Sequence, residues 1–102
     1  MKKKERIEIN DKTFTVDGTT DTFYSVSWAN DEKDIFESYG RPSQTKIAIW
    51  NDWCKWGREV GASLEIVSHN CFRFTIRGNV EYNGKMYNLY ITDRYNRAYE
   101  VV

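Results

Sequence analysis

Residues 47–60 read IAIWNDWCKWGREV, and this stretch is the strongest structural signal in the chain. It contains three tryptophans, Trp50, Trp53 and Trp56, each three residues from the next. Spacings of three and four residues stack side chains along one side of an α-helix. At ~100° per residue, the apolar residues fill about half of the helix surface, with Gly57 near the middle of that arc. We interpret the arc as the face that packs on a sheet, where Gly57 allows a close approach.

The apolar arc is wider than the ~100° stripe that is usual for a surface helix. One rim of it could therefore stay at the surface. Trp50 and Trp56 are the candidates for such a rim. Tryptophan is enriched among the residues that dominate binding energy at protein interfaces. The pattern thus leaves two roles open, a core helix and a helix whose edge anchors a partner.

Capping residues set the limits of this helix and predict a second one. Ser43 is a suitable N-cap and Gly61 a suitable residue just past the C-terminus, which gives a helix of about 17 residues. A short acidic helix is expected earlier in the chain. It would begin after Asn30 or Asp31 and run through Tyr39, before a glycine that ends it.

The N-terminal segment alternates between apolar and polar residues, which is typical of strands. We expect a hairpin formed by residues 5–9 and 13–16 around a turn at residues 10–12. A third strand is expected at residues 22–28. The predicted cross-strand pairs of the hairpin are Ile9 with Phe14 and Ile7 with Val16.

The last third of the sequence predicts an antiparallel meander. Asn83-Gly84 lies between two alternating runs, and Asn-Gly favours a type I′ hairpin because both central residues need positive φ. A second loop is expected at residues 69–71, and residues 97–102 could add a last strand. The predicted pairs are Val80 with Tyr87, Gly78 with Leu89, Ile76 with Ile91, Ile66 with Phe74, and Leu64 with Ile76.

These elements predict one α+β domain that spans residues 1–102. Its antiparallel sheet combines the N-terminal hairpin with the C-terminal meander, and the tryptophan-rich helix and the short acidic helix pack on it. A chain of this length must fill a modest core with large side chains. Four Trp, seven Tyr and five Phe meet that requirement.

The predicted register places a group of polar residues on the sheet face opposite the helix. Arg77 lies opposite Tyr90 there, and Arg73 would lie opposite Arg94 if the pairing continues that far. Arginine forks match carboxylate and phosphate groups, and tyrosine offers a stacking plane. We take Arg73, Arg77, Tyr90 and Arg94 as a candidate binding site. The alternative is an ordinary solvated face, since antiparallel sheets commonly expose one side.

Charge and targeting signals narrow the class of protein. Fifteen basic and fifteen acidic residues give a net charge of zero, which argues against a general polyanion binder. The charged N-terminus is not followed by an apolar segment, and no stretch reaches the ~18 apolar residues that span a bilayer. We therefore expect a cytoplasmic protein without membrane contact, in which the only cysteines, Cys54 and Cys71, are reduced.

Catalytic and cofactor motifs are weak in this sequence. His69 and Cys71 are two residues apart in a predicted turn, a spacing that rarely allows a nucleophile and its base to meet. One histidine and two cysteines cannot complete a zinc site. The six glycines are scattered rather than clustered in a phosphate loop. We expect no metal, no cofactor and no enzymatic activity.

A compact, aromatic-rich and cysteine-poor cytosolic domain of this kind resembles the small proteins of bacteriophages and mobile elements. Some of those proteins inhibit host defence, including anti-CRISPR proteins. The resemblance rests on size and composition, and it assigns no functional role to any residue of this chain. It implies a protein in the cytosol of a bacterial host that inhibits a defence protein by stoichiometric binding. The alternative hypothesis is a module that binds nucleic acid or a nucleotide through the arginine–tyrosine face.

Overall fold

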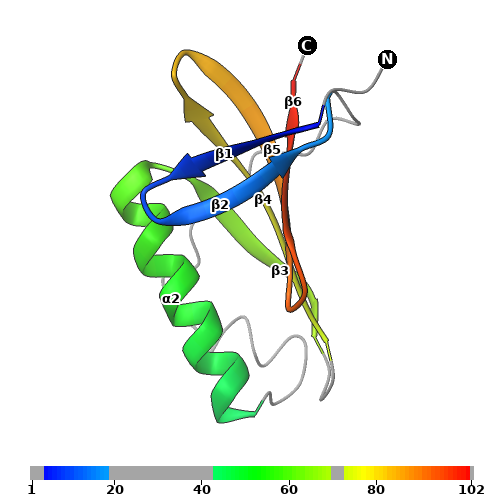
Figure 1. The fold of residues 1–102 in the computed structure, drawn as a ribbon. Helices are drawn as coiled ribbons and strands as arrows, with labels where there is room; N and C mark the ends of the chain where they lie inside the picture. The colour runs from blue at the N-terminus through cyan, green and yellow to red at the C-terminus, as the bar shows by residue number, and fades with distance from the viewer. Residues whose placement is uncertain (1–3, 19–42, 70–72, 102) are drawn as a thin grey trace.

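A computed structural model describes residues 4–18, 43–69 and 73–101 of the chain. They form an α+β arrangement in which one helix covers a six-stranded, mostly antiparallel sheet (Figure 1). The strands follow the order β1-β2-β6-β5-β4-β3 across the sheet. The elements are β1 (Glu5–Ile9), β2 (Lys12–Val16), α2 (Gln44–Val60), β3 (Ser63–His69), β4 (Phe74–Tyr82), β5 (Lys85–Thr92) and β6 (Asn96–Glu100).

The tryptophan helix begins and ends where its capping residues predicted. The Ser43 hydroxyl accepts a hydrogen bond from the backbone N–H of Lys46, and α2 is 17 residues long. Gly61 adopts the left-handed conformation, with φ of 76°. The N–H of Ala62 donates to the carbonyl of Gly57 at 2.9 Å, which is the Schellman pattern of a helix C-terminus.

The β4–β5 hairpin has the predicted register. Val80 pairs with Tyr87, Gly78 with Leu89 and Ile76 with Ile91. Positive φ values at Asn83 and Gly84 match the type I′ turn that this dipeptide favours.

Two other predicted registers are wrong by two residues. In the N-terminal hairpin Ile7, not Ile9, pairs with Phe14, because the turn uses only Asn10 and Asp11, both at positive φ. On the other side of the sheet, Ile66 pairs with Ile76 rather than with Phe74, because β3 extends to His69 and a bulge lies between Ile66 and Ser68. A shift of two residues keeps the side chains of these pairs on their expected faces.

The predicted last strand is present as β6, and its position joins the two halves of the sheet. It pairs antiparallel with β5 and parallel with β2, through Thr15 with Arg97 and Val16 with Ala98. The N-terminal hairpin is thereby attached to the C-terminal meander without being next to it in the sequence.

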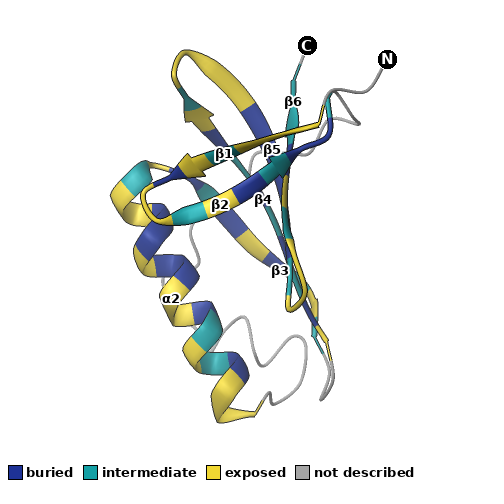
Figure 2. Ribbon diagram, in the orientation of Figure 1, coloured by how far each residue is buried: buried dark blue, intermediate teal, exposed yellow. Residues whose placement is uncertain are grey.

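The core lies between α2 and one face of the sheet, and buried residues line the helix surface that faces the strands (Figure 2). Phe14 packs against Trp53 and Trp56 at ring-centroid distances of 6.2 and 5.6 Å. The indole N–H of Trp56 donates to the carbonyl of Ile9 at 2.9 Å. At the surface, Lys12 forms an ion pair with Asp52 and lies over the Trp53 ring. The N-terminal hairpin is therefore fastened to the helix by aromatic packing, a buried hydrogen bond and an ion pair.

Some predictions fall outside the described residues. These are the third strand at residues 22–28, the short acidic helix from Asn30 or Asp31 to Tyr39, and the state of Cys71. Cys54 is described, and it is buried in α2.

Candidate functional site

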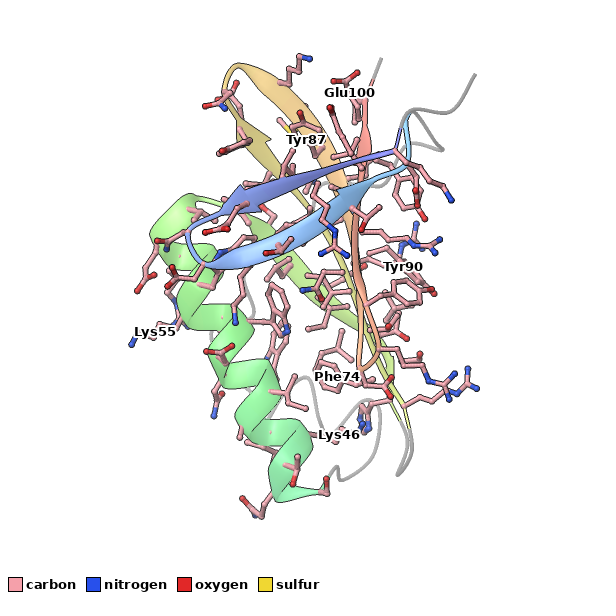
Figure 3. All side chains as sticks on the ribbon, in the orientation of Figure 1. Lys46, Lys55, Phe74, Tyr87, Tyr90 and Glu100 are labelled. Carbon is pink, nitrogen blue, oxygen red and sulfur yellow. The ribbon has the colours of Figure 1, made fainter. Side chains whose placement is uncertain are left out.

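The candidate site lies on the outer face, by which we mean the side of the sheet that points away from α2. In Figure 3 the side chain of Tyr90 points to this side, whereas Phe74 points toward the helix. Residues that pair directly across neighbouring strands project from the same face. One such row crosses all six strands, and we call it the arginine row: Arg6, Thr15, Arg97, Tyr90, Arg77 and Glu65, in strand order β1 to β3.

Charged and uncharged residues alternate along the arginine row from Arg6 to Arg77. Arg6, Arg97 and Arg77 occupy every second strand, with Thr15 and Tyr90 between them. Because adjacent strands are about 4.8 Å apart, consecutive arginines of the row are about 10 Å apart at the backbone. Each guanidinium thus has room for its own anionic group.

Two of the four outer-face residues predicted from the sequence are brought together. Arg77 pairs with Tyr90 as expected, and Thr75 pairs with Thr92 in the next register position. The ladder ends there. Arg73 precedes β4, and Arg94 lies in the turn between β5 and β6, so the predicted pairing of Arg73 with Arg94 is not formed. Both are exposed residues close to the end of the ladder.

The turn between β5 and β6 places Tyr95 beside the arginine row. The hydroxyl of Thr92 accepts hydrogen bonds from the backbone N–H groups of Arg94 and Tyr95, each at 3.1 Å. The N–H of Thr92 donates to the Tyr95 carbonyl at 2.8 Å and closes the turn. Tyr95 stacks on Tyr90 with a centroid distance of 6.3 Å and remains 43% exposed.

Arg97 contacts an aromatic ring and a carboxylate on this face. Its guanidinium carbon lies 4.6 Å from the centre of the Tyr95 ring, and its Nε is 3.4 Å from a carboxylate oxygen of Asp17. A hydrogen bond to Tyr99 raises the pKa of Arg97 above its usual value; burial opposes this shift, and the charge of Asp17 adds to it. The arginine is therefore positively charged at any physiological pH.

Acidic residues interleave with the arginines. Glu65 is the cross-strand neighbour of Arg77, and Asp17 is almost buried against Arg97. Near the end of the ladder, Asp93 accepts a hydrogen bond from the N–H of Phe74 at 3.4 Å. Burial would raise the pKa of Asp93, but backbone hydrogen bonds and the charge of Lys46 outweigh it and lower that pKa. The face carries both signs of charge.

Exposure is uneven along the outer face. Asn88, two residues before Tyr90 on the same strand, is only 3% exposed. Arg97, Tyr95, Arg94 and Arg73 are exposed, and Arg77 and Tyr90 are half-buried. The accessible part of the face is thus centred on the β5–β6 turn and its neighbours.

Trp50 and Trp56, the candidate anchors on the helix, are core residues. Trp50 is 1% exposed and Trp56 is 3% exposed. The rim that was expected at the surface is occupied instead by the partly buried Ile47, Ile49 and Val60. Neither tryptophan presents a surface to a partner in this structure, because the N-terminal hairpin and the sheet cover the helix face.

Sequence reasoning missed three contributors to the site: Arg6, Arg97 and Tyr95. Arg6 and Arg97 come into line with Arg77 only through the parallel pairing of β2 with β6. Alternation along residues 96–100 is a signal that places Arg97 and Ala98 on opposite faces of the sheet. No local signal predicted the pairing that adds β1 and β2 to the meander.

The described residues contain no cluster of three or more His, Cys, Asp or Glu side chains suited to a metal ion. Among them there is also no helix long and apolar enough to cross a membrane. Comparison with protein-family models, with curated proteins and with solved structures gives no match. The function is therefore argued from the geometry of the outer face.

Proposed function

We propose that this chain is a non-enzymatic binding protein and that its outer face binds an acidic surface of a protein partner. The observation that carries the proposal is the arginine row, with Arg97, Tyr90 and Arg77 on three adjacent strands. Arginine and tyrosine are enriched among the residues that dominate the energy of protein interfaces. Their side chains are held on a rigid sheet, which lowers the ordering cost of binding.

The mixture of charges favours a protein over a nucleic acid as the partner. The chain has no net charge, and Glu65 and Asp17 lie directly beside arginines of the row. A polyanion would meet these carboxylates as well as the guanidinium groups. A protein surface can present basic residues to the carboxylates and acidic residues to the arginines, which gives a defined register.

A nucleic-acid or nucleotide ligand is the second candidate, supported by one observation. Tyr90 and Tyr95 form a stacked aromatic pair beside Arg97. Proteins that bind single strands combine basic grooves with aromatic stacking platforms. The ring of Tyr95 already contacts Tyr90 and Arg97, so a base that stacks on it would have to compete with these two residues.

Affinity capture from a bacterial lysate tests the proposal. The double variant Arg77→Glu with Arg94→Glu should lose the captured protein, because it reverses one charge of the arginine row and one in the β5–β6 turn at its edge. The matched control is Lys55→Glu with Arg58→Glu, which makes the same change in charge on exposed positions of α2 and should retain capture. Nuclease treatment of the lysate should have no effect. Capture that survives the outer-face variant would refute the proposal, and capture that disappears with nuclease would favour nucleic acid.

The narrower hypothesis is that the partner is a bacterial defence protein and that the chain is a phage-encoded inhibitor acting in the host cytosol. It stays a prediction that follows from the resemblance in size and composition. Identification of the captured protein by mass spectrometry tests it. A defence nuclease or its complex would support it, and a metabolic enzyme would contradict it.

A further inference from the structure

Two groups hold the guanidinium of Arg97 in place on the outer face. Its Nε faces Asp17 at 3.4 Å, and the ring of Tyr95 lies 4.6 Å from its guanidinium carbon. The Asp17 side chain is only 8% exposed, whereas the Arg97 side chain is 44% exposed. One edge of the guanidinium therefore faces the protein and the rest faces solvent.

The backbone around this pair is also fixed. The N–H of Asp17 donates to the carbonyl of Ala98 at 3.1 Å, and the N–H of Glu100 donates to the carbonyl of Gly18 at 2.8 Å. These bonds continue the link between the end of β2 and β6. The backbone of Asp17, just after β2, is thus hydrogen-bonded to β6, the strand that carries Arg97.

A guanidinium has five N–H donors in a planar fork. When Nε is directed to an internal carboxylate, the two terminal nitrogens form the far edge of the same planar group, and this edge can bind a second carboxylate through two parallel hydrogen bonds. An arginine that is already ordered loses less side-chain entropy on binding than a mobile one.

We propose that Arg97 is the anchor of the outer face and that it binds the carboxylate of an aspartate or glutamate side chain of the protein partner. Asp17 and Tyr95 act as positioning residues, and Arg77 and Tyr90 contact neighbouring groups of the same partner. The proposal rests on the proposed function and adds the chemical group that the site recognises and the residue that recognises it.

Two features favour a carboxylate of a protein over the phosphates of a nucleic acid. Asp17 contributes a negative charge next to the anchor, so a single carboxylate suits this position better than a chain of phosphates. The two neighbours of Arg97 in the arginine row are Thr15 and Tyr90, which can donate one hydrogen bond each but carry no positive charge. The position matches one anionic group flanked by neutral ones.

NMR of the arginine side chains tests the anchor with a defined probe. A hexaglutamate peptide is titrated into the ¹⁵N-labelled protein, and the Nε–Hε signal of Arg97 is assigned by its loss in Arg97→Gln. We expect this signal to shift more than that of any other arginine. The affinity should fall about tenfold or more in Arg97→Gln and be rescued only in part by Arg97→Lys, because lysine cannot form two parallel hydrogen bonds. Arg58→Gln, on α2, is the matched control and should bind like the native protein.

The positioning residues are tested by the same titration. Tyr95→Leu removes the ring contact at an exposed position, so the protein should fold normally. Asp17→Asn keeps the size and removes the charge. Both should weaken hexaglutamate binding severalfold and average the signals of the Arg97 terminal nitrogens by faster rotation. Weaker binding without this averaging would contradict a positioning role.

The outcomes separate this inference from the proposed function. If Arg97→Gln keeps full binding to the captured protein while Arg77→Glu with Arg94→Glu loses it, the outer face binds but Arg97 is not its anchor. If the Arg97 signal shifts less with hexaglutamate than the signals of other arginines, Arg97 is likewise not the anchor. A larger shift and tighter binding with a ten-nucleotide oligothymidylate would overturn the assignment of a protein carboxylate in favour of nucleic acid.

Discussion

Strands β4, β5 and β6 have two faces that are built from alternate residues of the same short segments. On the inner face Ile76, Leu89 and Ala98 are at most 1% exposed and pack under α2. On the outer face, their neighbours Arg77, Tyr90 and Arg97 form a polar row. The core thus draws on the inner face, and we propose that the outer face is the one that binds a partner. Changes on the two faces should have separable effects on stability and on binding.

The largest loss of stability is expected from Trp56→Ala on the inner side. It removes packing against Phe14 and Trp53 and leaves the Ile9 carbonyl without its indole donor. The free energy of unfolding should fall by about 4 kcal/mol in a urea titration. Met86→Ala, an exposed residue of β5, is the control and should change it by less than about 0.5 kcal/mol. Similar losses in the two variants would mean that the faces do not differ.

A slightly smaller loss is expected from Gly78→Ala in the centre of the sheet. A Cβ atom at this position would lie 2.0 Å from the carbonyl oxygen of Ser63 and 2.7 Å from the Leu64 side chain. Either the backbone of β3 or that of β4 must move, which should cost about 3 kcal/mol. Gly84→Ala has open space around it and a positive φ, so it should cost about 1 kcal/mol. Equal costs in thermal unfolding would contradict the steric explanation.

The contact between the N-terminal hairpin and the helix should contribute less. Lys12→Met removes the ion pair with Asp52 and the charge over the Trp53 ring, and keeps most of the aliphatic stem. We expect a loss of about 1 kcal/mol that decreases as salt is added. Lys85→Met is the matched control. It removes the ion pair between Lys85 and Glu100, in which the lysine side chain is 57% exposed. A larger loss for Lys85→Met would contradict the prediction that the Lys12 contact stabilises the fold more than an exposed ion pair does.

Substitutions on the outer side should affect binding more than stability. Arg77→Ala with Arg94→Ala should leave the free energy of unfolding within about 0.5 kcal/mol per residue of the native value, because neither residue packs in the core. Binding to the captured protein should nevertheless fall at least tenfold, as expected for central interface residues (about 1.4 kcal/mol). A loss of stability in parallel with binding would indicate that this face is structural.

The smallest expected effect is the dependence of stability on pH in the acidic range. The pKa of Asp93 is lowered in the folded protein relative to its usual value of 3.8. The stabilisation from its carboxylate is therefore present above about pH 3.8, the value of the unfolded chain, and is lost as the pH falls through the lower folded value. The difference in stability between the native protein and Asp93→Asn should be constant above that pH and shrink below it. A difference that does not vary with pH would contradict the assignment.

Much of the fold followed from local signals in the sequence. Ser43 and Gly61 set both ends of α2, and Asn83-Gly84 set the register of β4 with β5. Ser43 acts through its hydroxyl, which accepts the Lys46 N–H, and Gly61 and Asn83-Gly84 act through positive φ, so their effect depends little on the rest of the chain. The loops without such a motif were placed two residues off, because Asp11 adopts positive φ without a glycine beside it and β3 contains a bulge.

The candidate site was predicted only in part for a related reason. Arg77 and Tyr90 are joined by the Asn-Gly hairpin, so their pairing was local. Arg6 and Arg97 join the row through the contact between β2 and β6, which are about eighty residues apart and have no turn to set their register. The burial of Trp50 and Trp56 likewise depends on the distant hairpin, which the helix pattern alone could not place.

The most direct test of the account compares the two sides of the molecule with one purified partner. Isothermal titration calorimetry would give the affinity of the captured protein for Arg77→Glu with Arg94→Glu and for Lys55→Glu with Arg58→Glu, after both variants are shown to unfold at similar temperatures. We predict that the outer-face variant loses at least tenfold in affinity and that the helix variant binds like the native protein. The reverse result, with binding lost only in the helix variant, would contradict the central claim that the outer face is the binding surface.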